Sequence, residues 1–137
     1  MSVRPEVLEV LRQWVRKAEH DLEAARRIMA EEEGCPYDTA CFHCQQSIEK
    51  YLKALLTLSG VPALRTHDFE KLLALLPPDK RISIATESLV AINSYAVEVR
   101  YSDDWLEPRR DEAIQAFELA ERVRADIRRM LPPEALI

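Results

Sequence analysis

The sequence predicts an all-α protein, an up-down antiparallel four-helix bundle with one short extra helix. Apolar residues recur at alternating spacings of three and four in four long stretches, which is the pattern of amphipathic helices. The chain has only two glycines, whereas the tight hairpins and bulges of all-β folds use glycine heavily. With 137 residues and 47% hydrophobic content, we expect one domain over residues 1–137 with a single core.

The first predicted helix runs from about residue 5 to residue 33. Pro5 suits its first turn, where a missing N–H costs nothing, and Gly34 followed by Pro36 favours its end. The second predicted helix covers about 36–59. It is apolar over so much of its circumference that we place it at the centre of the bundle. The two apolar stripes consist of Leu8, Leu11, Val15, Ala18, Leu22, Ala25 and Met29, and of Tyr37, Cys41, Cys44, Ile48, Tyr51, Leu55 and Leu58.

A short third helix is predicted after Thr66, a residue type that often caps a helix N-terminus. The fourth predicted helix covers about 79–100. The fifth begins near Pro108, with acidic residues in its first turn and arginines in its last, both favourable for the helix dipole. Residues 132–137 are expected to form a loose tail. Surplus apolar residues on the first and fifth helices favour a homodimer; they are Val7, Trp14, Ile114 and Phe117.

Composition and the absence of targeting signals exclude several functional classes. The formal charge of −5 argues against indiscriminate DNA binding, and the scarcity of glycine excludes dinucleotide-binding loops and P-loops. No apolar run approaches the roughly 20 residues of a membrane helix, and the N-terminus lacks the pattern of a signal peptide. We therefore expect a cytoplasmic protein with reduced cysteines, no membrane association, no metal and no cofactor.

Cysteine and polar residues follow two different patterns on the second predicted helix. The cysteine spacing is unlike the CxxC pairs of structural zinc sites, so we expect Cys41 and Cys44 to be buried thiols. A polar, partly basic stripe recurs at spacings of three, four and three residues. It fits either a groove that binds phosphate or a base edge, or the solvated back of an amphipathic helix. The stripe consists of His43, Gln46, Lys50 and Lys53.

Gln45 and Glu49 lie on the flank of this helix and are expected to be half buried. A buried carboxylate needs a cationic or hydrogen-bonding partner, and Arg100 is the candidate for Glu49, either in a site or as a lock between helices. His67 stands beside Asp68 at the predicted start of the third helix. It fits either a base oriented by that carboxylate or a capping and packing residue.

The segment after the fourth predicted helix gathers a cation, a phenol, two carboxylates and an indole. Loops on rigid scaffolds often carry function, so this segment is either a ligand-binding loop or a polar connection with its indole against the bundle. Two adjacent carboxylates hold Mg²⁺ only weakly without phosphate ligands. The segment consists of Arg100, Tyr101, Ser102, Asp103, Asp104 and Trp105.

Four runs of sequence together resemble the HEPN domain. They are Trp14 with 18–22 (AEHDL), 40–56 (ACFHCQQSIEKYLKALL), 66–69 (THDF) with Leu72 and Leu73, and 100–103 (RYSD). The resemblance covers nearly the whole chain, and the run 40–56 is its most specific part. It implies an all-α bundle that dimerises, in a cytoplasmic prokaryotic protein often encoded beside a minimal nucleotidyltransferase (MNT) in a two-gene module that is toxin–antitoxin-like.

The resemblance also implies a metal-independent ribonuclease site, which this sequence matches only in part. Arg100 corresponds to the motif arginine, but the positions where the motif histidine belongs hold Trp105, Leu106 and Glu107. That histidine would take the proton of the ribose 2′-hydroxyl while the arginine stabilises the charged phosphorane. Arginine binds phosphate but cannot act as a base near neutral pH. His43 and His67 are the remaining candidate bases.

Three functions therefore stay open. The first is a HEPN subunit, with ribonuclease activity in question, that binds nucleotide or RNA phosphate near Arg100 and pairs with an MNT protein. The second is a metal-independent ribonuclease toxin with a diverged site, and the third is a purely structural dimerisation module. The candidate ligand-binding residues are Arg100, Tyr101, Asp103, Asp104, Gln46, Glu49, Lys50 and Lys53.

Overall fold

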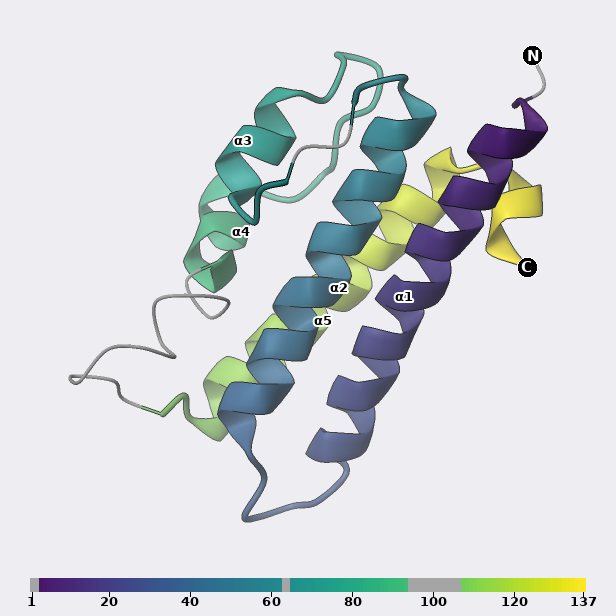
Figure 1. Ribbon diagram of the computed structural model, residues 1–137. Helices are drawn as coiled ribbons and strands as arrows, with labels where there is room; N and C mark the ends of the chain where they lie inside the picture. Colours follow the sequence, from purple (N-terminus) through teal and green to yellow (C-terminus); the bar gives the residue numbers. More distant parts are fainter. Residues whose placement is uncertain (1–2, 63–64, 94–106) are drawn as a thin grey trace.

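The computed structural model describes residues 3–62, 65–93 and 107–137, and it contains helices and no strands in these ranges. The all-α prediction is confirmed. Figure 1 shows α1 (Pro5–Met29) and α2 (Tyr37–Leu58) side by side, α5 (Arg110–Met130) behind them, and α3 (Phe69–Ala74) and α4 (Thr86–Asn93) on the other side of α2. A short 3-10 helix, η2 (Pro133–Leu136), follows α5. Within the described ranges, no helix is both long and apolar enough to cross a membrane.

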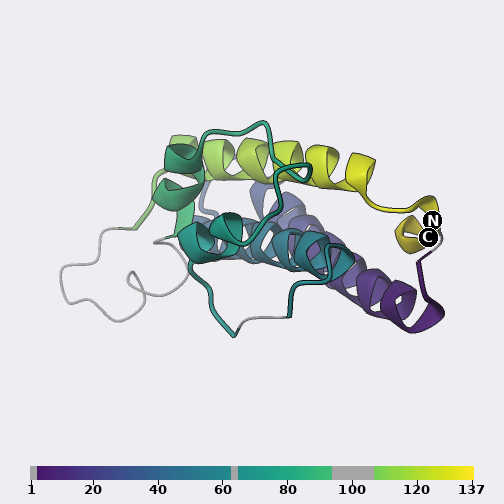
Figure 2. The ribbon, with the colours of Figure 1, turned by 90° about the horizontal axis from the view of Figure 1, so that it is seen from above.

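The helix α2 lies at the centre of the bundle, as its broad apolar circumference predicted. It packs against each of the other four α-helices of the described ranges. Ile48, Tyr51 and Leu55 on this helix are fully buried. Seen from above in Figure 2, α5 lies across one side of the α1–α2 pair.

The cysteines of α2 belong to the core. Cys41 and Cys44 are fully buried and form no disulfide, as predicted for thiols on the inner face of the helix. Burial raises the pKa of both thiols to about 12, because a buried thiolate would lose its hydration, and nearby acidic side chains add to this effect. Both side chains therefore act as small, protonated hydrophobes.

The first helix ends at Met29, earlier than the predicted end near residue 33. Arg110 at the start of α5 donates hydrogen bonds to the backbone oxygens of Glu31 and Glu32, at 3.1 and 3.0 Å. These tertiary bonds hold the carbonyls outside a helix. Gly34 then takes a φ of +74°, a left-handed conformation that glycine adopts without strain.

The fourth helix differs most from its prediction, because residues 79–85 are not helical. Both the backbone N–H and the hydroxyl of Ser83 donate to Oδ2 of Asp126 on α5, at 2.9 and 2.6 Å. Ser83 and Asp126 are 43 residues apart in sequence. Because the N–H of Ser83 is bonded to Asp126, it does not form a hydrogen bond within a helix. The helix α4 begins only at Thr86, and residues 94–100 of the predicted helix lie outside the described ranges.

Two further local expectations are corrected. Asp68, not Thr66, caps α3: its Oδ1 accepts a hydrogen bond from the N–H of Glu70 at 3.0 Å. Residues 132–137 are not a loose tail, because η2 packs against α1. Arg12 donates to the backbone oxygen of Glu134 at 2.9 Å, and Ala135 is fully buried.

The charge of Asp126 makes the stability of the fold depend on pH. Burial raises the pKa of its carboxyl, but the hydrogen bonds from Ser83 and the contact with Arg129 outweigh burial and hold that pKa below its ordinary 3.8. A carboxyl with a lowered folded-state pKa stabilises the protein above the unfolded pKa, and this contribution disappears as the pH falls through the folded pKa. We expect Asp126→Asn to lower the free energy of unfolding by about 1–3 kcal/mol at neutral pH.

Urea unfolding at neutral pH and at steps below pH 3.8 measures this effect. The difference between Asp126→Asn and the parent chain should shrink as the pH falls below 3.8. The matched control is Asp79→Asn, because the Asp79 side chain is 76% exposed and pairs only with Lys80 in the described part of the chain. A difference that is the same at every pH would mean that the charge of Asp126 does not contribute.

Candidate functional site

Three of the four residues in the polar stripe of α2 are divided between two clusters, each of which joins a histidine, a carboxylate and a lysine. The Asp21 cluster consists of Asp21 on α1 with His43 and Lys50 on α2. Nδ1 of His43 lies 2.8 Å from Oδ1 of Asp21, and Lys50 pairs with the other carboxylate oxygen. This cluster ties the two longest helices together along their shared face.

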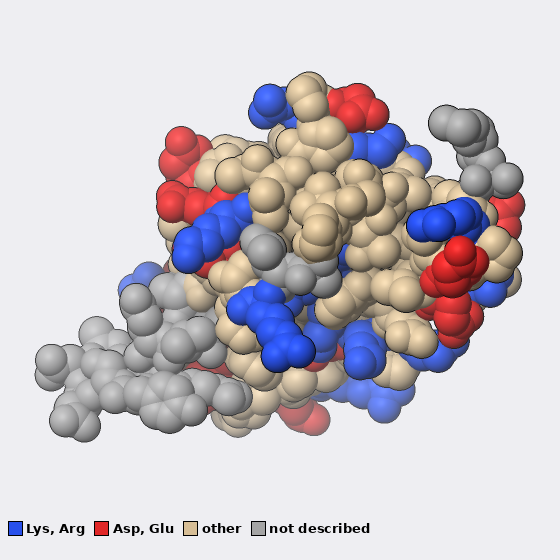
Figure 3. Space-filling model, turned by 45° about the horizontal axis from the view of Figure 1, so that its top comes forward, with Lys and Arg blue, Asp and Glu red and all other residues tan. Residues whose placement is uncertain are grey.

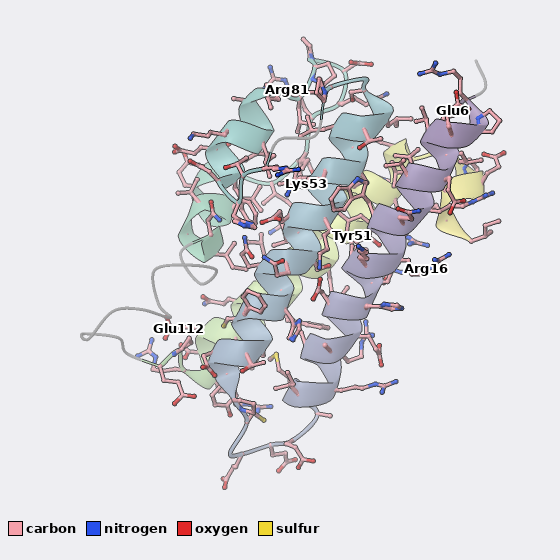
Figure 4. The ribbon with its side chains drawn as sticks, in the orientation of Figure 1. Glu6, Arg16, Tyr51, Lys53, Arg81 and Glu112 are labelled. Carbon is pink, nitrogen blue, oxygen red and sulfur yellow. The ribbon has the colours of Figure 1, made fainter. Side chains whose placement is uncertain are left out.

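The Glu49 cluster consists of Glu49 and Lys53 on α2 with His67 from the turn before α3. Nδ1 of His67 lies 2.7 Å from Oε1 of Glu49, and Nζ of Lys53 donates to Oε2 at 3.0 Å. The Glu49 and Lys53 side chains are only 4% and 11% exposed, whereas the His67 side chain is 60% exposed. The ammonium of Lys53 also lies 5.7 Å from the centre of the Trp14 ring, and Figure 4 labels Lys53 on α2.

The hydrogen bond to Glu49 determines which nitrogen of His67 carries hydrogen. An ionised carboxylate only accepts hydrogen bonds, so Nδ1 must be the donor. In a neutral imidazole the other nitrogen, Nε2, is then an acceptor. Nε2 has no hydrogen-bond partner among the described residues, and the exposed ring offers it to solvent.

The side chain of Asn93 forms two hydrogen bonds with the backbone around His67. Asn93, the last residue of α4, donates to the backbone oxygen of His67 at 2.6 Å and accepts from the N–H of Phe69 at 2.7 Å. Phe69 itself is fully buried. A side chain on such a frame is held in place better than one on a free loop.

A third polar cluster joins α1, α2 and α5. Oε1 of Glu19 accepts hydrogen bonds from Tyr51 at 2.5 Å, Arg124 at 2.6 Å and Arg128 at 2.9 Å. Burial, followed by the hydrogen bond to Glu19, raises the pKa of Tyr51 to about 12, so its hydroxyl is a stable donor. Figure 4 places Tyr51 in the space between α2 and α1, and we interpret this cluster as a lock between three helices.

The structure brings part of the predicted ligand-binding set together. Glu49 and Lys53 share one cluster, Lys50 belongs to the other, and Gln46 donates to Oε1 of its neighbour Gln45 at 2.7 Å. The charges of both lysines are thus balanced by carboxylates inside the chain. The remaining predicted ligand-binding residues, Arg100, Tyr101, Asp103 and Asp104, lie outside the described residues.

Glu49 and His67 are partners of each other in the structure. Glu49 is paired with His67 and Lys53, and its candidate partner Arg100 lies outside the described residues. Asp68, the candidate for orienting His67 as a base, caps α3, and His67 is hydrogen-bonded to Glu49 instead. Gln45 and Glu49 are buried rather than half buried.

Sequence reasoning did not single out Asp21 and Glu19 as site residues. Both stand on the flank of the apolar stripe of α1, next to Ala18 and Leu22. A carboxylate in that position is a usable signal, because a partly buried acid needs a partner from a neighbouring helix. No group of three or more metal-ligating side chains occurs in the described part of the chain.

The fold and the sequence together identify the class of protein. The family model of the HEPN domain matches residues 11–130, and the chain belongs to this family. Two solved structures are similar to it. The protein TT1696 from Thermus thermophilus has 29% identity and a TM-score of 0.74, covering 88% of this chain and 98% of TT1696. ST0689, an archaeal HEPN homologue, has 26% identity and a TM-score of 0.66, covering 88% and 96% of the two chains. No curated protein matches the sequence.

Proposed function

We propose that this chain is the HEPN subunit of a two-gene, toxin–antitoxin-like module with a minimal nucleotidyltransferase, and that it binds the phosphate of a nucleotide or RNA. Membership of the HEPN family supports the partnership. The arrangement of charges supports the ligand class. The charges of Lys50 and Lys53 are balanced by carboxylates within the chain, whereas exposed cations elsewhere remain available to an anion.

The observation that carries the proposal is the set of exposed cations without an ion pair in the described ranges. Arg65 stands two residues before the exposed His67, and Lys71 stands four residues after it. Figure 3 shows that basic side chains gather from the centre of that view toward its lower right, with few acidic ones among them. The exposed Lys and Arg residues with no partner among the described residues are Arg16, Lys17, Arg65, Lys71, Arg81 and Arg122.

Arg100→Ala tests phosphate binding at the motif position. Binding of a random-sequence single-stranded RNA, followed by fluorescence anisotropy at low salt, is expected to weaken about 10- to 100-fold, as the loss of a charge-assisted hydrogen bond implies. The melting temperature should stay nearly unchanged. Arg4→Ala is the control, since the Arg4 side chain is 77% exposed near the N-terminus. A large drop in melting temperature would instead make Arg100 a structural ion-pair partner.

The same samples separate the alternative functions. Cleavage of RNA without metal, abolished by Arg100→Ala, would make the chain a ribonuclease with a diverged site. Absence of binding to both RNA and nucleotides would favour a purely structural module.

Assembly is tested in two steps. Co-expression with the MNT protein of the same genome is expected to give a complex that survives purification. Without it, light scattering is expected to report a homodimer, twice the chain mass of 15.8 kDa. The apolar side chains Val10 and Ile114, which are 40% and 36% exposed, support such an interface.

A further inference from the structure

We propose that His67 recognises ribose: its Nε2 accepts a hydrogen bond from the 2′-hydroxyl of a bound ribonucleotide or RNA, and Glu49 is the positioning residue that fixes the ring. The inference rests on the proposed function, because it needs a nucleotide or RNA as ligand. It deepens that function by naming the sugar as the feature that is recognised.

The contact with Glu49 makes the ring an acceptor toward the ligand. Because Nδ1 donates to Oε1 of Glu49 at 2.7 Å, the neutral ring offers a lone pair at Nε2. The phosphodiester groups of a nucleic acid carry no hydrogen to donate to that lone pair. Base amino groups and sugar hydroxyls do, and among these donors the 2′-hydroxyl is present in RNA and absent from DNA.

The charge of Glu49 is balanced inside the chain. Glu49 brings one negative charge into a site where its side chain is 4% exposed, and Lys53 supplies the compensating positive charge from 3.0 Å. His67 is therefore not needed to neutralise Glu49. Arg65 and Lys71, on either side of His67 in sequence, are exposed and have no ion pair among the described residues.

The Asp21 cluster shows what a purely structural version of this arrangement looks like. It has the same three groups, and Nδ1 of His43 lies 2.8 Å from its carboxylate. The His43 side chain, however, is 28% exposed, whereas that of His67 is 60% exposed. The two histidines thus have matched ring chemistry and different access to a ligand, so His43 is an internal control.

The experiment compares RNA with DNA on the intact chain. A random-sequence RNA decamer and the DNA decamer of the same composition are titrated against the parent chain, His67→Gln and His43→Gln by fluorescence anisotropy. A second titration compares the four ribonucleoside monophosphates with their 2′-deoxy forms. It shows whether the ribose that is bound belongs to a free nucleotide or to RNA. We expect the parent and His43→Gln to prefer the ribose form about 3- to 10-fold, and His67→Gln to lose this preference.

Nitrogen NMR of ¹⁵N-histidine-labelled protein distinguishes direct contact between His67 and the ligand from a purely structural role of His67. The Nε2 resonance of His67, assigned by its absence in His67→Gln, is expected to shift on addition of the ribose ligand, while that of His43 stays in place. Equal binding of ribose and deoxyribose forms, or an unmoved His67 signal with ligand bound, would overturn the inference and leave the proposed phosphate binding standing. Absence of binding by every probe would overturn both.

Discussion

Ile48→Ala is expected to lower the free energy of unfolding by about 2–5 kcal/mol, the usual cost of removing a large side chain from a closed core. Ile48 is fully buried at the middle of α2, which contacts every other α-helix of the described ranges. Helix backbones on several sides limit how far the surroundings can collapse into the space left behind. Urea unfolding followed by circular dichroism measures the loss as a lower midpoint at an unchanged slope.

Ile137→Ala, after η2, is the matched control for this substitution. It removes the same atoms, but Ile137 is 89% exposed. Its effect on the free energy of unfolding should stay within about 0.5 kcal/mol, as is usual for surface positions. Equal losses for the two variants would contradict a central position of α2, and an unchanged midpoint for Ile48→Ala would do so directly.

The fold could be predicted because its signal is carried by long periodic stretches. The stripe through Ile48, Tyr51 and Leu55 indicated both a helix and its central position, and all three residues are fully buried. Helix ends were less predictable. The start of α4 depends on Ser83 bonding to Asp126, 43 residues away, and such tertiary contacts leave no periodic trace in sequence.

The candidate site, too, could be predicted only in part. The need of Glu49 for a partner followed from its place on an apolar flank, because buried carboxylates are costly when unpaired. Which partner it has did not follow, since the turn of His67 reaches α2 through the anchoring of Phe69 and Asn93. Periodicity within one helix predicts which residues are buried. It does not predict which loop from another part of the chain covers them.

Glu49→Leu is expected to destabilise the protein by about 3–5 kcal/mol, the cost of leaving one charge of a buried pair without its partner. The substitution removes the carboxylate 3.0 Å from the ammonium of Lys53, whose side chain is 11% exposed. The face of Trp14 then remains beside that ammonium, and an aromatic face stabilises a cation much less than a carboxylate does. Urea unfolding of the single variants Glu49→Leu and Lys53→Met and of the double variant measures the coupling.

The double variant decides whether the ion pair or the packing of α2 is responsible. Replacing both partners by apolar residues of similar volume removes the unpaired charge, and such replacements are often neutral or stabilising. Most of the stability lost in Glu49→Leu should therefore return when Lys53→Met is added. Glu23→Leu is the surface control, because Glu23 is 44% exposed in its pairs with Arg26 and Arg27, and solvent-screened pairs of this kind contribute little to stability. If the double variant is as unstable as Glu49→Leu alone, the loss comes from packing, and Glu49 does not act by compensating the charge of Lys53.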